Sequence, residues 1–342
     1  MDTPKIAFSI IIFIGSIVIL YVGQDFLIPL VIAIGAWFFF NAVANSFTKI
    51  KLKGKVLPLW SRYLLTTLSI GLFVFFLSKL ISSNINDLQD NIAHYNENIH
   101  TLQAKLFEKL GIENDINIIP SFMSQLDIGS MISKVALSLS SILSNTFLII
   151  LYLIFLLIEQ RMFGKKIRLI FKERYHDKVD ASITKIKQSI ESYILIKTMV
   201  SMLTGILSYI VLRIIGVDFA FFWAFLIFML NYIPSVGSLI ATVFPALLAI
   251  IQFDTLMPAV YVLIGIGVIQ LVIGNFLEPK LFGNSLNISS LAVILSLTFW
   301  GLLWDVTGMF LCVPITVILM VVANNFEETK PIAILLSDDG EV

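Results

Sequence analysis

Residues 219–253 read FAFFWAFLIFMLNYIPSVGSLIATVFPALLAIIQF, an apolar run that is interrupted at Asn231-Tyr-Ile-Pro-Ser-Val-Gly237. Each side of the interruption is short for an untilted crossing of a hydrocarbon core of about 30 Å, since a helix rises about 1.5 Å per residue. Pro234 removes an amide donor and Gly237 permits a positive φ, so we expect unpaired carbonyl groups at the tip. The pattern predicts a re-entrant helical hairpin, or alternatively two short crossings.

A comparable interruption lies near the carboxyl end. Ser289 to Trp304 is apolar, Asp305-Val-Thr-Gly308 breaks the run, and an apolar segment then resumes to residue 323. An uninterrupted span precedes each of the two broken segments, and counting crossings makes the two units point in opposite directions. Inverted repeats of this kind around a site near the bilayer midplane are typical of secondary transporters. If every half-helix crosses instead, the parity of the termini is the same.

The composition excludes a soluble protein. Of the 342 residues, 58% are hydrophobic and 13% are charged, whereas soluble domains have about 45–50% and about 25%. The 23 basic residues equal the 23 acidic ones, which gives no support to nucleic-acid binding. With three His and the single Cys312, we expect no metal site and no cofactor. The fold class is therefore all-α, a polytopic membrane protein with about six full spans plus the two interrupted hairpins.

The domain organisation follows from the alternation of apolar and polar segments. We expect the first three transmembrane helices in 1–81, an extracytoplasmic amphipathic helical segment in 82–134, the fourth transmembrane helix in 135–158, a basic cytoplasmic amphipathic helix in 159–198, the transport core with both hairpins in 199–326, and a cytoplasmic tail in 327–342. Segment 159–197 carries ten basic residues against five acidic ones. Because Lys and Arg collect in short cytoplasmic loops, both termini are predicted to be cytoplasmic.

The extracytoplasmic segment contains an apolar heptad pattern. Its stripe has a 3.5-residue period over three heptads and consists of Ile85, Leu88, Ile92, Tyr95, Ile99, Leu102 and Leu106. Such a stripe packs on the protein's own surface, lies on lipid headgroups, or forms a seam between protomers. Because the stripe is narrow and flanked by Asn, Asp, Gln and Glu, we favour packing against protein, either the protein's own surface or a second protomer, and we expect a homo-oligomer.

Polar residues within the apolar runs are the candidate site, because a charge at the bilayer centre costs about 2.5–3.5 kcal/mol. Glu278 either binds a proton or sodium beside Asn275, with Pro279 ending the helix, or pairs with Lys280 at the interface. Asp305 serves ion coupling or caps the following half-helix. The residues predicted to line the pathway for substrate or ion are Asn231, Pro234, Gly237, Asn275, Glu278, Asp305 and Gly308.

Asn231 has two interpretations. An asparagine in an apolar helix more often forms an interhelical hydrogen bond than contacts a substrate. Its position beside the interruption makes it the polar residue most worth testing as a ligand.

The motifs together resemble a known family. Asn231–Gly237 with Pro245, the stretch Asn275-Phe-Leu-Glu-Pro-Lys-Leu-Phe-Gly283, and a terminal pattern of Gly301, Gly308 and Pro314 are similar to those of the autoinducer-2 exporter family of permease-like membrane proteins. The resemblance covers nearly the whole chain. It implies a bacterial inner-membrane protein, with family members assigned to export of the furanosyl signal autoinducer-2 or to sodium/proton antiport.

The functional prediction is an ion-gradient-driven secondary transporter that exports a small polar solute or exchanges sodium for protons. The chain has no Walker-type phosphate-binding loop of its own. An intramembrane enzyme is poorly supported, because no His lies in an apolar run and no His-Glu-x-x-His occurs. The remaining alternative is a passive pore or an oligomeric membrane scaffold.

Overall fold

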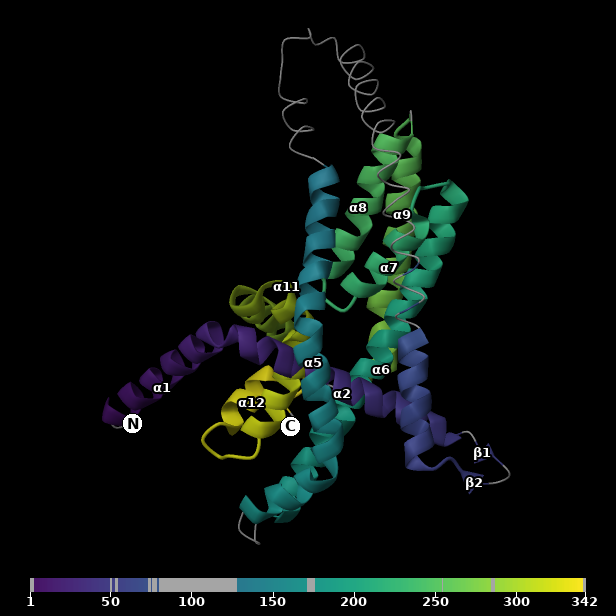
Figure 1. The fold of residues 1–342 in the computed structure, drawn as a ribbon. Coiled ribbons are helices and arrows are strands. Elements are labelled where there is room, and N and C mark those ends of the chain that lie inside the picture. The colour runs from purple at the N-terminus through teal and green to yellow at the C-terminus, as the bar shows by residue number, and fades with distance from the viewer. Residues whose placement is uncertain are drawn as a thin grey trace. The chain divides into compact units, whose positions relative to one another are not determined.

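The computed structural model describes residues 3–49, 51–52, 55–72, 75, 79, 128–170, 176–253, 255–283 and 287–340. Helices account for most of these residues (Figure 1). The heptad residues 85–106 lie outside the described ranges, so the extracytoplasmic helix and the seam between protomers stay predictions. The helical class of the chain is confirmed.

The amino-terminal part consists of two apolar helices and a short basic hairpin. Helix α1 spans Thr3–Val22 and α2 spans Gln24–Ser46, and the 3₁₀ turn η1 (Phe47–Lys49) follows. Strands β1 (Lys51–Leu52) and β2 (Lys55–Val56) then pair antiparallel. A further helix covers residues 59–72.

Two long helices follow. Helix α5 spans Ile128–Ile170, and its direction changes by 74° between Thr146–Gln160 and Met162–Ile170. Helix α6 is one uninterrupted helix of 40 residues, His176–Ile215. The basic amphipathic pattern and the apolar span expected from residue 199 are thus continuous, because no helix-breaking residue separates them.

The described carboxyl-terminal part contains seven helical segments. The first six are α7 (Ala220–Leu230), α8 (Val236–Gln252), α9 (Met257–Val272), the π-helical turn η3 (Ile273–Leu277), α10 (Glu278–Phe282) and α11 (Ser290–Ala323). Helix α12 (Lys330–Leu336) ends the series. Among the described residues, four helical segments are long and apolar enough to cross a membrane, or five when the bent α5 is included.

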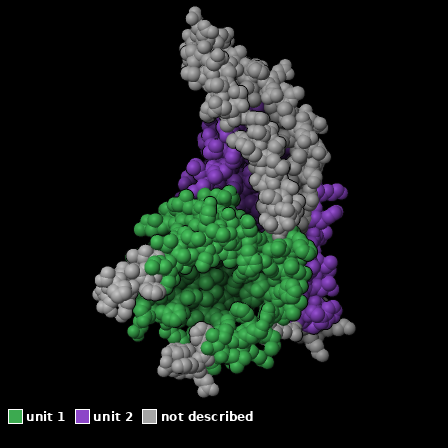
Figure 2. All heavy atoms as spheres, turned by 60° about the vertical axis from the view of Figure 1, so that its left-hand side comes forward, with its two compact units in different colours: residues 1–57, 145–196, 282–342 green, residues 58–144, 197–281 purple. Residues whose placement is uncertain are grey.

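The chain divides into two compact units (Figure 2). The first unit comprises Met1–Leu57, Asn145–Ile196 and Phe282–Val342. The second comprises Pro58–Ser144 and Lys197–Leu281. Each broken segment therefore belongs to a different unit.

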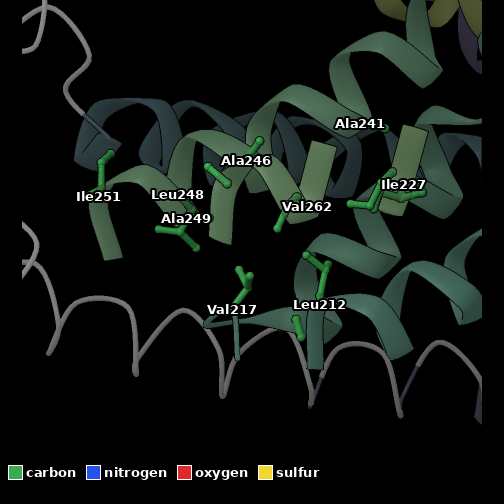
Figure 3. Packing of buried hydrophobic residues seen from close by; sticks show 12 residues of the cluster. Leu212, Val217, Ile227, Ala241, Ala246, Leu248, Ala249, Ile251 and Val262 are labelled. Carbon is green, nitrogen blue, oxygen red and sulfur yellow. The ribbon is translucent and has the colours of Figure 1, made fainter. Parts of the chain in front are cut away.

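The core of the second unit joins helices α6 to α9. Figure 3 shows Leu212 and Val217 lying opposite Ala249 and Val262. Several members of this buried cluster are alanines, which let the helix backbones approach closely. The cluster holds Leu212, Val217, Ala220, Ile227, Ala241, Ala246, Leu248, Ala249, Ile251, Ala259, Val262 and Ile266.

Helices α7 and α8 form a helical hairpin. The base of the hairpin is closed by Gln252, whose Nε2 donates to the Gly216 carbonyl (2.8 Å) and whose Oε1 accepts from the Asp218 amide (2.7 Å). Between the arms, the rings of Trp223 and Phe244 stack with centroids 6.4 Å apart. The chain therefore returns to its starting level at Gln252.

The turn of this hairpin differs from the prediction in two respects. The positive φ falls on Ser235 (58°) rather than on Gly237. Gly237 is needed for a different reason, since an added Cβ would lie 2.8 Å from the Leu230 carbonyl carbon. The carbonyl groups of Leu230, Ile233 and Pro234 accept amide hydrogen bonds within the turn, so the expected unpaired carbonyls are not found at these three positions.

Helix α11 is a second hairpin, in the first unit. Its backbone leaves the helical region at Trp304 (φ −131°, ψ 21°) and Asp305 (φ 51°, ψ −140°). The two arms then lie side by side, because the Ser296 hydroxyl donates to the Cys312 carbonyl at 3.1 Å and also contacts the Thr316 hydroxyl. Gly308 is the point of closest approach, where an added Cβ would lie 2.5 Å from the carbonyl carbon of Trp300.

Candidate functional site

An ion pair formed by a buried lysine is the central feature of the second unit. The Nζ of Lys197 on α6 donates to the Oε1 of Glu278 at the start of α10. The Lys197 side chain is 7% exposed and that of Glu278 is 20% exposed. Glu278 is therefore paired with Lys197, and the expected pairing with Lys280 is not the arrangement found.

The π-helical turn η3 positions Glu278. Pro279 lacks an amide hydrogen, and its ring would clash with the carbonyl four residues earlier, at Asn275, in an ordinary α-helix. The wider π turn at Ile273–Leu277 accommodates the proline, and α10 continues beyond it to Phe282. Pro279 thus does not end the helix as expected. Single π turns are frequent at functional sites.

The tip of the first hairpin contacts the same turn of α6 that carries Lys197. Asn231 is buried, and its Nδ2 donates to the Ser201 Oγ at 3.1 Å. The Tyr232 hydroxyl and the Thr198 Oγ1 lie 2.7 Å apart and form a hydrogen bond. For Asn231 this geometry fits the expected interhelical hydrogen bond.

A polar face continues along α6 beyond this turn. Lys197, Ser201, Thr204 and Ser208 follow one another at intervals of four, three and four residues, and all four are buried. Residues at this spacing share one helix face, which extends for about 16 Å at about 1.5 Å per residue. Among the described residues, no hydrogen-bond partner is found for the Ser208 Oγ or for the Nε2 of Gln270 on α9. Buried polar atoms of this kind are positions for water or a polar solute.

Close helix packing supports this face. An added Cβ at Gly205 of α6 would lie 3.1 Å from the Ala224 carbonyl oxygen and 3.2 Å from the Phe228 Cβ, both on α7. Gly205 therefore lets α7 approach the polar face of α6 closely. The tip of the first hairpin and the polar face of α6 thus pack together within the second unit.

The predicted residues of the second hairpin lie in the first unit. Asp305 is exposed at the break between the two arms. Within the described residues its carboxylate has no hydrogen-bond partner, so the expected helix cap is not observed. The neighbouring Trp304 is buried, and its Nε1 donates to the Leu20 carbonyl at 3.0 Å.

The structure brings only some of the predicted site residues together. Asn231 and Glu278 are linked through one turn of α6, and Pro234 and Gly237 shape the tip that carries Asn231. Asn275 is exposed and takes no part in the ion pair. Asp305 and Gly308 shape the turn of the other hairpin.

The prediction missed four contributors, three on α6 and one in the hairpin tip itself. They are Lys197, Thr198, Ser201 and Tyr232. The sequence did contain a signal, because a lysine followed by small hydroxyl residues at positions four, seven and eleven marks a polar face on an otherwise apolar helix. In the described part of the chain, no three His, Cys, Asp or Glu side chains are grouped so as to hold a metal ion.

Several apolar spans, two helical hairpins and a partly buried ion pair define a multi-pass integral membrane protein. The model of the AI-2E family transporters matches residues 9–328. The chain belongs to this family, as the motifs at Asn231–Gly237 and Asn275–Gly283 predicted, and membrane transport is its function.

Several relatives align over nearly the full chain. The AI-2 transport protein TqsA of Escherichia coli (strain K12) is 31% identical over 335 residues, with 96% of each chain covered. A putative transport protein of Haemophilus influenzae is 31% identical over 336 residues, with 95% of each chain covered. A putative transport protein of Borreliella burgdorferi is 39% identical over 194 residues, which is 56% of this chain and 54% of that protein.

Proposed function

We propose that the chain is a secondary transporter, driven by an ion gradient, that exports a small polar solute resembling autoinducer-2 or exchanges sodium for protons. The similarity to an AI-2 transport protein over 96% of the chain supports the solute class. The observation that carries the proposal is the pairing of the buried Lys197 with Glu278 beside the tip residue Asn231.

Stability alone does not account for this pair. Desolvating two charges is costly, and replacing a buried ion pair with apolar side chains of similar volume is often neutral or stabilising. Ionisable groups in membrane spans accordingly mark ion or substrate pathways. Lys197 and Glu278 lie at one end of the polar face of α6, so a solute on that face would meet the ion pair and the hairpin tip together.

The length of the first arm of the α7–α8 hairpin supports a re-entrant segment. Helix α7 has eleven residues and is therefore about 16 Å long, roughly half of the hydrocarbon core. We propose that the first hairpin enters the bilayer from outside and the second from inside, in a bacterial inner membrane with both termini cytoplasmic. The protein would act as a homo-oligomer in the lipid bilayer.

A flux assay with purified protein in proteoliposomes tests the function. An imposed proton or sodium gradient should drive exchange, read by an internal pH dye, or export of a furanosyl solute. Glu278→Gln should abolish the response to the gradient, because the buried lysine loses its counter-charge. Glu327→Gln, at an exposed acid after α11, is the matched control and should behave as the wild type.

Three outcomes would contradict the proposal. Flux that ignores both gradients, or that is the same in the Glu278→Gln variant, would remove ion coupling. Single-channel currents without coupled flux would instead favour the passive pore.

A further inference from the structure

One turn of α6 carries three separate links to two other parts of the candidate site. Lys197 holds Glu278, Thr198 holds the Tyr232 hydroxyl, and Ser201 holds Asn231. The first link leads to the segment after the π turn and the other two lead to the hairpin tip. Glu278 and the hairpin tip are thus both bound to the same five residues of α6, 197–201.

We propose that Lys197 is a positioning residue that couples Glu278 to the tip of the α7–α8 hairpin. While the ion pair is intact, the turn at residues 197–201 presents Thr198 and Ser201 to the tip and the tip is docked. When Glu278 loses its charge or exchanges Lys197 for another cation, the turn moves and the tip is released. The inference rests on the proposed function in one respect, namely that release of the tip opens the polar face to the solute.

The burial of Lys197 makes the coupling obligatory. The residue is 5% exposed as a whole, so without its partner it becomes an uncompensated charge in a low-dielectric environment. The ammonium group must then turn toward water, and in a Lys197→Met variant the unpaired Glu278 carboxylate must do the same. Lys197 and Ser201 are four residues apart and share a face of the helix, so a rotation that carries Lys197 away also carries Ser201 away from Asn231.

Both partners of this turn lie in or directly after irregular backbone. Glu278 follows the π turn η3, which contains one residue more than an α-helical turn. A shift of this extra residue along the helix would move Glu278. The hairpin tip is an irregular turn in which Ser235 has φ 58°. Neither partner lies in regular α-helical backbone on both sides, so a rotation of α6 at residues 197–201 can separate from both.

Cysteine reactivity at the tip tests the proposal. Ile233 is 5% exposed, so an Ile233→Cys side chain should react slowly with a maleimide while the tip is docked. The native thiol is removed with Cys312→Ala. Ser235→Cys, at an exposed tip position, is a reference that should react at one rate in every background.

We expect Lys197→Met and Glu278→Gln each to raise the labelling rate at position 233 by fivefold or more. The rate should then approach that of the exposed reference at position 235. The charge-swapped double variant, Lys197→Glu with Glu278→Lys, should restore slow labelling. Lys187→Met, which breaks a pair with Glu191 at 3.9 Å on the same helix, should change nothing.

A variant that keeps both charges guards against misfolding as an explanation. Thr198→Val with Ser201→Ala removes the two tip links and should raise the labelling rate by itself. Adding Lys197→Met to that variant should then give no further increase, because the link through which Lys197 acts is already lost. An unchanged rate in the Lys197 and Glu278 variants, failure of the charge swap to slow labelling, or additive effects would each overturn the proposal.

The labelling is measured in detergent without any gradient. If labelling at position 233 responds to loss of the ion pair but the protein shows no coupled flux, the transport proposal is wrong and the coupling between Glu278 and the tip stands. If the protein shows coupled flux but labelling at position 233 does not respond to loss of the ion pair, the coupling is wrong and the transport proposal stands.

Discussion

Replacing Gly237 with alanine should destabilise the first hairpin. The new Cβ would lie 2.8 Å from the Leu230 carbonyl carbon and 3.1 Å from the Ile233 Cβ. Carbon atoms in contact prefer about 3.5–4.0 Å, so the arms must separate by about 0.7 Å or more. The obstacle is helix backbone, which cannot rotate out of the way as a side chain can.

The expected cost lies at the upper end of the range for overpacking. Inserting a methyl group into a packed site costs about 1–3 kcal/mol, and a backbone clash leaves little room for relief, so we expect about 3 kcal/mol. Gly267 in α9 is the matched control, since an added Cβ there meets nothing within 4 Å. Gly267→Ala should stabilise the helix by about 0.5–1 kcal/mol, because glycine is a poor helix former.

Thermal unfolding of the purified protein in detergent, followed by tryptophan fluorescence, measures both effects. Gly237→Ala should lower the Tm by about 6 °C or more, at roughly 2 °C per kcal/mol for a large domain. Gly267→Ala should leave the Tm unchanged or raise it. The close-packed turn would be refuted by a Gly237→Ala protein as stable as the wild type, or by equal losses in the two variants.

Three further predictions concern the base of the first hairpin, the turn of the second and the carboxyl-terminal helix. Gln252→Ala removes the bond to the Gly216 carbonyl and should cost about 1–3 kcal/mol; an unchanged Tm would contradict the closed base. Asp305→Gly should stabilise by about 1 kcal/mol, because φ 51° strains a non-glycine residue; a lower Tm would show that the carboxylate contributes more than the strain costs. Deleting α12 removes the Leu336 carbonyl, which accepts from the Ser289 amide at 2.9 Å, so hydrogen exchange at Ser289 should accelerate, and an unchanged rate would disprove this contact.

The broad architecture could be predicted because apolar runs and breaks depend on local chemistry. The interruptions at Asn231–Gly237 and near Asp305 became the turns of two helical hairpins. The glycines at both turns were identified, but their role was misassigned at Gly237. The sequence places a glycine at the turn. Only the packing of the second arm against the first shows that this glycine avoids a clash with Leu230.

The ion pair could not be predicted because its partners are 81 residues apart in the sequence. Lys280 was the nearest cation to Glu278 in sequence, and sequence distance was the only guide. Lys197 closed a basic segment and so resembled a solvated cytoplasmic residue. The burial of Lys197 depends on how the continuous helix α6 packs in the folded protein, which the local sequence does not show.

The C-terminal segment illustrates the same limit. Residues after 326 were expected to form a plain tail, yet α12 packs with Ala333 fully buried. Asn287 Nδ2 also donates to Asp339 at 2.6 Å. The short segment KPIAILL is too brief to predict as a docked helix, because its stability depends on what it packs against.

The most direct test of the account is a cryo-electron microscopy structure of the protein in lipid nanodiscs, in which the bilayer boundaries are visible. We predict that the turns at Ser235 and Asp305 lie between the two headgroup layers and that water reaches the polar face of α6. Turns that protrude beyond the bilayer on helices that cross it fully, with no aqueous route to Lys197 and Glu278, would contradict the account.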